Sequence, residues 1–325
     1  MKATARAHSN IAFVKYWGRK DEELRIPTNG SISMNLSNLF TTTTVEFSPL
    51  YLSDEVVVKD EINETTVKRV ITHIDRVREL ANSTLKSKVV SINSFPSGTG
   101  LSSSASGMAA LTLAATKALR LDLSEKELSI LARQGSGSAS RSIPSGFVEW
   151  VDGNTSEESF SQSIFPAEHW DIVDIVVVVS KEKKDVSTSE GQKRAESSLF
   201  FQTRLNHIQE KIASCRNLIG KRNFSEFGKL IEMEALELHA IMITSWPPLI
   251  YWLPQSIYVM KSVQKWREEG LEVYFTVNTG QDIHVICQKK DEAKITARIK
   301  GLENIIKIIR NSPSNGTYLL KDHLF

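Results

Sequence analysis

The sequence predicts a globular protein of mixed α and β structure, built as two halves. Its 325 residues are enough for two domains or one large one. Strand-like and helix-like patterns alternate through the first half, and long helical patterns dominate the second. The composition becomes charged and polar between residues 180 and 195, so we place the boundary there, with one domain at 1–184 and the other at 185–325.

The first half contains clear helix and strand signals. Apolar residues three and four positions apart predict one amphipathic helix, and a run of good helix formers predicts a second. Ser124 followed by Glu127 is a capping box, which predicts that a third helix begins there and ends near Arg133. The other predicted elements are the strands Thr41–Phe47 and Lys88–Ser94 and the helices Glu64–Ala81 and Ala105–Leu119.

The second half opens on an apolar strand, continues through three helices and ends on a strand pair. Pro247 and Pro248 end the middle helix, because proline lacks the N–H that a helix interior requires. The predicted helices are Arg194–Leu218, Phe224–Ile243 and Leu253–Glu269, and the predicted strands are Ile172–Ser180, Val273–Thr276 and Ile283–Gln288.

Composition and charge exclude several classes of protein. The net charge of +2 leaves no basic excess to neutralise a run of phosphates, so nucleic acid is not expected as a partner. Two cysteines, Cys215 and Cys287, are too few for a disulfide scaffold and predict reduced thiols in a cytoplasmic protein. Residues 1–9 lack an apolar signal core, and no stretch of about 18 apolar residues occurs, so no membrane span is expected.

The segment between Lys88–Ser94 and Ala105–Leu119 is rich in glycine and serine. Glycine lets the backbone approach a ligand, serine adds hydroxyl donors, and the following helix presents free N–H groups. Together these features predict a phosphate-binding loop, although a plain turn has the same composition and no Walker A lysine follows. The residues predicted to bind this ligand are Ser94, Pro96, Ser97, Gly98, Thr99, Gly100, Leu101, Ser102, Ser103 and Ser104.

Two further segments place cations beside small or aromatic residues. Gly135–Arg141 leads glycines and serines into an arginine, whose planar guanidinium suits a carboxylate or a phosphate. Asn10–Lys20 combines an apolar stretch with cations and aromatic side chains. Each segment also has a purely structural explanation, because the first fits a surface turn and the second fits an amphipathic edge strand.

These segments occur together in an order that resembles the GHMP kinase superfamily. The glycine- and serine-rich loop is similar to the ATP-binding motif of that superfamily. Several other segments resemble the diphosphomevalonate decarboxylase family, and the resemblance extends over residues 10–288. Those segments are Lys15–Arg19, Ser136–Arg141, Gly146–Trp150, Glu237–Ala240 and Pro247–Trp252.

The resemblance implies both a fold and a reaction. The fold is α+β, of the GHMP kinase type, with an N-terminal half like a ribosomal protein domain and a ferredoxin-like C-terminal half over a deep cleft. The reaction uses ATP and Mg²⁺ to phosphorylate the 3-hydroxyl of mevalonate 5-diphosphate. Phosphate and carbon dioxide then leave, and isopentenyl diphosphate forms in the mevalonate pathway of isoprenoid biosynthesis. The resemblance also implies a cytoplasmic homodimer.

The resemblance also implies roles for individual residues. Lys15 and Arg141 are expected at the reacting end of the substrate, with Arg141 orienting its carboxylate or hydroxyl. Ser104 is expected at the ATP phosphates or the magnesium ion. The other residues expected to hold the phosphorylated mevalonate are Tyr16, Trp17, Gly18, Arg19, Ser136, Gly137, Ser138, Ala139, Ser140 and Ser189.

The sequence departs from the family at the catalytic aspartate. Asn278 stands where the family has that aspartate, and Asp282 stands at the family's asparagine. An amide cannot accept a proton as a carboxylate does. Either Asp282 reaches the same place from the other end of the turn, or the enzyme phosphorylates without decarboxylating, as a mevalonate 3-kinase does, or its activity is weak or altered in substrate.

Two further functions stay open at this point. The substrate of the decarboxylation is either mevalonate 5-diphosphate or the monophosphate, and the sequence does not separate them. The chain is alternatively a non-catalytic nucleotide-binding relative that lost activity with its aspartate. Turnover of ATP distinguishes this binding protein from an enzyme.

Overall fold

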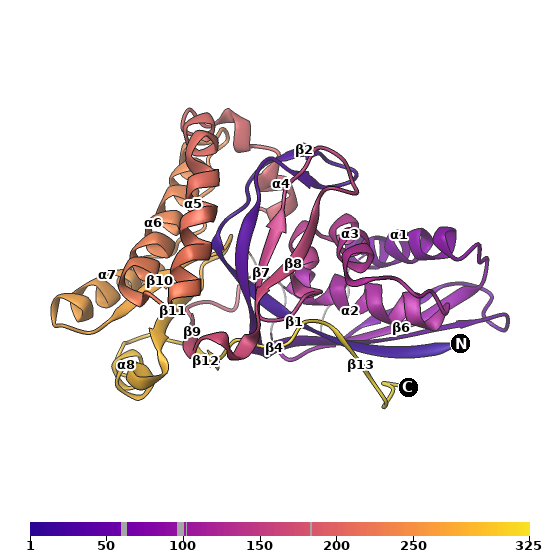
Figure 1. Ribbon diagram of the computed structural model, residues 1–325. Coiled ribbons are helices and arrows are strands. Elements are labelled where there is room, and N and C mark those ends of the chain that lie inside the picture. The colour runs from indigo at the N-terminus through magenta and orange to yellow at the C-terminus, as the bar shows by residue number, and fades with distance from the viewer. Residues whose placement is uncertain (60–63, 96–100, 102, 183) are drawn as a thin grey trace.

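A computed structural model describes residues 1–59, 64–95, 101, 103–182 and 184–325, and within them two antiparallel-dominated sheets carry the fold. Figure 1 places helices α1–α3 at one end of the molecule, over the long strands β1 and β4, and α5–α7 at the other end. The α+β class is confirmed.

The described part of the first sheet has seven strands. The path runs β13-β1-β4-β6-β5, and β7 pairs with the far end of β4 and carries β8 outside it. Only the β5–β6 pair is parallel among these pairs. The strands are β1 (Lys2–Val14), β4 (Ser31–Ser48), β5 (Glu55–Val58), β6 (Lys86–Asn93), β7 (Phe147–Val151), β8 (Phe160–Phe165) and β13 (Tyr318–Leu320).

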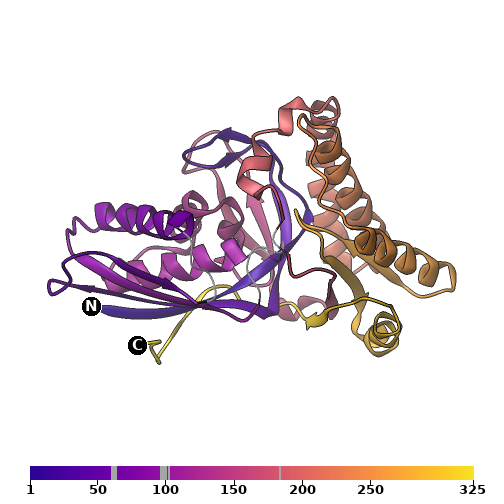
Figure 2. The same ribbon diagram turned by 180° about the vertical axis from the view of Figure 1, so that it is seen from behind.

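Three helices cover one face of this sheet, as Figure 2 shows from behind. The central helix consists of small and apolar residues and is buried along most of its length, so it packs directly on β1 and β4. The capping box at Ser124 and Glu127 is present and begins the third helix. The helices are α1 (Glu64–Leu80), α2 (Ser103–Ala118) and α3 (Glu125–Gly135), and a 3-10 turn, η1 (Gly137–Ser142), follows α3.

The second sheet is antiparallel in the order β10-β11-β9-β12 and packs on helices from the C-terminal half. Its strands are β9 (Ile172–Val178), β10 (Val273–Thr276), β11 (Ile283–Gln288) and β12 (Lys307–Asn311). Its helices are α4 (Thr188–Gln192), α5 (Phe201–Lys221), α6 (Phe224–Thr244), α7 (Pro254–Glu268) and α8 (Glu292–Lys300). Short pieces complete the described chain: the hairpin β2 (Arg19–Asp21) and β3 (Ile26–Pro27), and the 3-10 turns η2 (Ala167–His169), η3 (Ala195–Ser197) and η4 (Lys289–Asp291).

The chain crosses twice between the halves. Strand β9 precedes residue 184 and yet is a central strand of the second sheet, whereas β13 returns from the C-terminal end to pair with β1. The halves also share an apolar core, in which the rings of Phe13 on β1 and Phe227 on α6 lie 4.8 Å apart. A boundary between residues 184 and 185 stays a prediction.

The predicted elements differ from the structure mainly at their ends. The helix predicted over Arg194–Leu218 begins only at Phe201, because η3 and Ser198 interrupt it: Ser198 Oγ bonds to Thr244 Oγ1 at 2.7 Å. Strand β4 begins ten residues before the predicted Thr41. No described helix is long and apolar enough to cross a membrane.

Candidate active site

A cavity of about 420 Å³ opens between the two halves. Its described lining contains six cationic side chains and no aspartate or glutamate. Several positive charges on a lining without described carboxylates create a strong attraction for anions in a partly dry site. The cationic residues are Lys15, Arg19, Arg25, Arg69, Arg141 and Lys184.

Lys15 directly follows strand β1 and lines the cavity. Its backbone is fixed on both sides, because its N–H donates to Glu234 Oε1 at 2.9 Å and its carbonyl accepts from Arg204 Nη2 at 2.8 Å. Its Nζ donates to Ala12 O at 2.6 Å and Thr276 Oγ1 at 2.8 Å. Burial lowers the pKa of Lys15 to about 7, so this ammonium group is close to losing its proton at neutral pH.

Arg141 lies in the turn η1 and is 3% exposed. Nη1 donates to Ser31 Oγ at 2.8 Å and Nη2 to Asn10 Oδ1 at 3.1 Å, while its guanidinium lies 5.6 Å from the ring of Tyr16. Burial lowers its pKa to about 10, which still leaves it charged at pH 7. No described carboxylate forms an ion pair with it, so this buried cation is suited to an anionic group of a ligand.

The turn after β10 brings Asn278 to Lys15. Lys15 Nζ donates to Asn278 Oδ1 at 3.4 Å, and the ring of His239 lies 2.9 Å from the Asn278 carbonyl through Nε2. Burial lowers the pKa of His239 to about 3, so the ring is neutral and its Nε2–H donates to that carbonyl. His239 also stacks on Trp252 at 4.4 Å, which fixes the orientation of the ring and of the turn.

Asp282 has a different position from the one expected of a base. It is 3% exposed, does not line the cavity, and its Oδ1 accepts from the backbone N–H of Val179 at 3.0 Å. This contact ties the turn to the end of β9. We therefore do not assign Asp282 to the chemistry.

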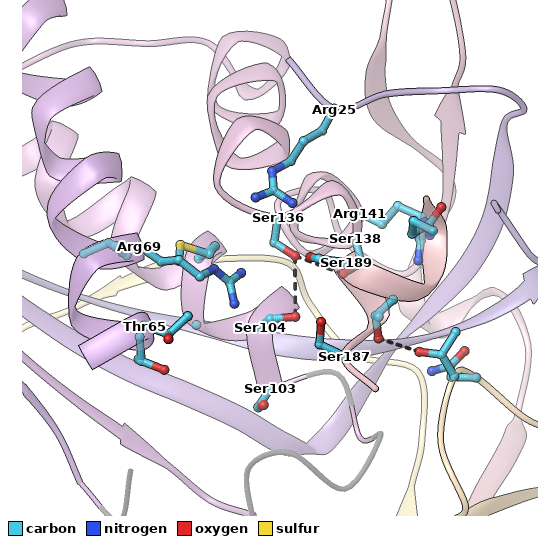
Figure 3. Close-up of a pocket in the computed structure, with 18 of the residues that line it drawn as sticks. Arg25, Thr65, Arg69, Ser103, Ser104, Ser136, Ser138, Arg141, Ser187 and Ser189 are labelled. Carbon is cyan, nitrogen blue, oxygen red and sulfur yellow. Dashed lines mark hydrogen bonds between the residues drawn. The ribbon is translucent and has the colours of Figure 1, made fainter. Parts of the chain in front are cut away.

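Hydroxyl groups gather beside Arg19 and Tyr16, which both line the cavity. Ser136 Oγ lies 3.5 Å from Ser104 Oγ and 3.4 Å from Ser138 Oγ. Figure 3 shows Ser104 of α2 facing Ser136, which lies between α3 and η1, with Ser138 of η1 beside it. Ser189 on α4 also lines the cavity.

Five residues expected to bind substrate are not among the described residues that line the cavity, and their role in binding stays a prediction. Trp17 is fully buried against Leu249 and Tyr251, because its indole fills the core under α6. Gly18 adopts φ 91 and donates its N–H to Gln192 Oε1 at 2.6 Å, so it shapes the turn. These two residues position Tyr16 and Arg19 and do not line the cavity.

Three of these residues belong to η1. A Cβ on Gly137 would lie 2.7 Å from Tyr16 Oη, so glycine here makes room for the tyrosine. Ala139 is buried in the core, and Ser140 Oγ donates to the Gly137 carbonyl at 2.9 Å. None of these three residues is among those that line the cavity, and all three are buried.

The predicted phosphate loop is described only at its ends. Ser103 and Ser104 begin α2 and line the cavity at the N-terminus of this 16-residue helix. Ser94 and Leu101 do not line it: Ser94 Oγ donates to Asn38 O at 3.0 Å, and Leu101 packs in the core. The residues Pro96, Ser97, Gly98, Thr99, Gly100 and Ser102 lie outside the described residues.

The hydroxyls of Ser103 and Ser104 fit a magnesium–nucleotide ligand. Mg²⁺ prefers oxygen ligands, keeps several waters and is commonly bound through substrate phosphates rather than by a protein cage. The N–H groups at the start of α2 add a positive potential toward phosphates. Beyond this end, the cavity becomes apolar between α1, α2, β5 and β6, with Val58, Val70, Val89, Met108 and Leu111 in its wall.

Sequence reasoning missed several residues of the site. Arg25, Arg69 and Lys184 line the cavity, and Asn10 holds Arg141. Lys184 donates to Thr188 Oγ1 at 2.6 Å, and burial lowers its pKa to about 8. A single arginine on a hairpin or a helix carries no periodic signal, so nothing in the sequence distinguished these residues from surface cations.

Two family models match the chain. The diphosphomevalonate decarboxylase-like N-terminal domain matches residues 7–161, and the mevalonate 5-diphosphate decarboxylase C-terminal domain matches residues 174–315. The chain is 35% identical over 324 residues to a diphosphomevalonate decarboxylase of Aspergillus fumigatus, covering 93% of this chain and 80% of the relative. It is 36% identical over 287 residues to a phosphomevalonate decarboxylase of Haloferax volcanii, covering 88% of each.

Solved structures agree with these matches. The mevalonate diphosphate decarboxylase from Enterococcus faecalis superimposes with a TM-score of 0.92 at 34% identity, covering 99% of both chains. That from Staphylococcus aureus gives 0.92 at 36% identity, with 98% of both covered. A further structure, of MDDEF in complex with MVAPP, AMPPCP and magnesium, gives 0.93 at 36% identity, with 99% of both covered. With matching domains in both halves and a common fold throughout, the chain belongs to the diphosphomevalonate decarboxylase family.

Proposed function

We propose that this chain is an ATP- and Mg²⁺-dependent decarboxylase that converts mevalonate 5-diphosphate into isopentenyl diphosphate by way of 3-hydroxyl phosphorylation. The observation that carries this assignment is Arg141, a buried guanidinium without a described ion pair that lines a cavity rich in cations. The substrate has a carboxylate at one end and phosphates at the other, and the cavity offers cations for both.

The reaction divides the work among three parts of the site. Arg141 holds the substrate carboxylate, because a planar guanidinium matches a carboxylate by paired hydrogen bonds. Tyr16, Arg19, Ser136 and Ser138 hold the phosphate tail. ATP and Mg²⁺ supply the phosphoryl group that turns the tertiary hydroxyl into a leaving group, and Ser103 and Ser104 at the start of α2 are the described residues that would hold them.

Lys15 and Asn278 lie at the reacting end. Lys15, with a pKa of about 7, is partly neutral at physiological pH and is the described group nearest Asn278 that accepts a proton in this range. The Asn278 amide orients the hydroxyl by hydrogen bonds. Phosphoryl transfer depends mainly on positioning and charge, so the asparagine is compatible with the first step of the reaction.

Two alternatives are favoured by specific observations. The Haloferax volcanii relative, whose name gives the monophosphate as substrate, is as similar as the diphosphomevalonate decarboxylases. Asn278 in the place of an aspartate favours an enzyme that phosphorylates and stops. Both alternatives keep the same cavity and differ in the phosphate tail or in the second chemical step.

One assay separates all of these readings. The purified protein is given ATP, Mg²⁺ and either mevalonate 5-diphosphate or mevalonate 5-phosphate, and ADP, carbon dioxide and the organic product are measured together. ADP with carbon dioxide from the diphosphate supports the proposal, and ADP alone identifies a kinase. Nucleotide binding without ADP identifies a binding protein and contradicts the proposal.

We further propose that the protein is a cytoplasmic homodimer. In support, apolar side chains are exposed where η3, α5 and the end of α6 meet: Leu199 is 92% exposed and Trp246 78%. Trp246 N donates to Ser197 Oγ at 2.8 Å, so these residues belong to one surface. Sedimentation that finds a monomer at micromolar concentration would rule out the dimer.

A further inference from the structure

Arg25 is held in a fixed direction by the hairpin between β2 and β3. It adopts the left-handed backbone conformation, with φ 54, which is unfavourable for a residue with a side chain. Its Nε donates to the carbonyl of Gln134 at 2.9 Å, and the carbonyl of Leu24 accepts from Arg133 Nε at 2.9 Å. Both contacts tie the hairpin to the end of α3. These contacts fix the orientation of the Arg25 side chain, which lines the cavity.

The surroundings of Arg25 are cationic. Among the described residues, the only hydrogen bond of its guanidinium is the one through Nε, and no carboxylate forms an ion pair with it. Arg19, by contrast, pairs with Glu22 at 2.7 Å. Burial, then Arg19, then Arg69 lower the pKa of Arg25 to about 10, which leaves it charged at neutral pH. Like charges gathered in a half-buried place are unfavourable until an anion joins them.

The position of Arg25 relates it to the phosphate tail. Figure 3 shows its guanidinium pointing toward Ser136, which lies between Ser104 at the nucleotide end and Ser138 at the substrate end. Tyr16 and Arg19 also line the cavity and interact electrostatically with Arg25. If Arg19 and the neighbouring hydroxyls hold one phosphate, Arg25 is a further cation on the lining that a second phosphate could reach.

We propose that Arg25 is a specificity-determining residue that binds the terminal phosphate of the substrate and makes the enzyme prefer the diphosphate over the monophosphate. This inference rests on the proposed function and goes beyond it by naming the residue that separates the two substrates. Two terminal N–H groups of a guanidinium match two oxygens of a phosphate, so the fork and the charge both contribute.

The test compares Arg25→Gln and Arg25→Lys with the wild type on both substrates. For Arg25→Gln, the KM for mevalonate 5-diphosphate rises by about tenfold or more, because a hydrogen bond between charged groups is lost. Arg25→Gln changes three other constants by less than about threefold, because Arg25 contacts only the terminal phosphate: the KM for mevalonate 5-phosphate, the KM for ATP, and kcat. Arg25→Lys, which keeps the charge and loses the fork, lies between the wild type and Arg25→Gln.

Arg120→Gln is the matched control. Arg120 also has a left-handed backbone, with φ 60, but lies at the end of α2 and does not line the cavity. The Arg120→Gln substitution therefore removes one arginine from an equally unfavourable backbone conformation and leaves the cavity lining unchanged. Its kinetic constants stay at wild-type values.

Binding measurements keep the inference testable without turnover. With a non-hydrolysable ATP analogue present, calorimetry compares inorganic pyrophosphate with inorganic phosphate. The wild type binds pyrophosphate more tightly, and Arg25→Gln loses most of that difference. The inference is overturned if Arg25→Gln loses affinity equally for both anions, if only its KM for ATP changes, or if the wild type prefers mevalonate 5-phosphate. A preference for the monophosphate leaves decarboxylation itself intact.

Failure of the proposed function looks different, because the wild type then releases no carbon dioxide.

Discussion

At the scale of single residues, the site consists of buried cations whose partners are mostly neutral. Arg141 is bonded to a serine and an asparagine, and Lys15 to a carbonyl and a threonine. Removing a charge from water is costly, and neutral partners return only part of that cost. The free protein therefore carries unfavourable charge that an anionic ligand relieves, which makes these positions sensitive to substitution.

Arg141→Lys tests the geometry of the carboxylate contact. Lysine keeps the charge but replaces the planar fork with a single ammonium point, so the reacting group is held less accurately. We expect kcat to fall about 10²-fold or more, because small displacements of reacting groups have effects of that size. Steady-state kinetics measures it, and thermal unfolding checks that the variant is folded. A near-wild-type rate would remove Arg141 from the site.

Asn278→Asp tests the departure from the family aspartate. The new carboxylate would lie beside Lys15 Nζ, which now approaches Asn278 Oδ1 at 3.4 Å. We expect carbon dioxide release to rise, by up to about 10²-fold, since general base catalysis contributes at least that much where the base is well placed. Asp282→Asn is the control: Asn still accepts from the N–H of Val179, so its effect is mild. A larger loss of carbon dioxide release in Asp282→Asn would restore Asp282 as the base.

At the scale of elements, the N-terminus of α2 faces the cavity and the N-terminus of α3 faces solvent. Ser104 in the first turn of α2 lines the cavity, whereas Ser124, the residue before α3, accepts from the N–H of Glu127 in a capping box. A serine side chain therefore faces the cavity at the start of α2 and caps the helix at the start of α3. This difference provides a matched pair of variants.

Ser104→Ala is expected to raise the KM for ATP by about tenfold, because hydrogen bonds to charged groups contribute about 1.5–3 kcal/mol. Stability changes little. Ser124→Ala has the reverse effect: it lowers the free energy of unfolding by about 1 kcal/mol and leaves the KM for ATP unchanged. Kinetics and urea unfolding on both variants measure the contrast. Equal effects on KM would mean that Ser104 acts through helix stability alone.

At the scale of the whole molecule, a buried ion-pair network connects the halves at the site. Arg204 on α5 pairs with Glu234 on α6, and both bond to the backbone of Lys15 at the end of β1. Lys211 extends the network to Glu237, which also pairs with Arg204. Because its members come from three elements, the network fixes the place of Lys15 relative to the second half.

Glu234→Gln is expected to lower the free energy of unfolding by about 3–5 kcal/mol, since it leaves the buried Arg204 without its main partner. Arg204 holds the pKa of Glu234 below its usual 4.5 against the effect of burial. The wild-type advantage over Glu234→Gln is therefore fully present above pH 4.5 and is lost as the pH falls through the lowered folded value. Thermal melts between pH 3 and pH 7 measure both effects. An advantage independent of pH would contradict the network.

The sequence by itself determined the features that depend on local order. Periodic apolar residues predict most of the helices, and Ser124 with Glu127 predicts the start of α3. The motifs around Lys15, Arg141 and Ser104 predict three of the segments that line the cavity. These features were readable because helix caps, turns and hydrophobic faces arise from residues a few positions apart.

Only the tertiary structure decided which of those residues face the ligand. Trp17 and Ala139 carry the motif and yet fill the core, whereas Arg25 and Arg69 belong to no motif and line the cavity. It also separated Asn278, beside Lys15, from Asp282, which bonds to β9. The physical reason is that a side chain's surroundings are set by contacts between residues distant in sequence, and here the packing of β1, η1 and α6 fixes those contacts.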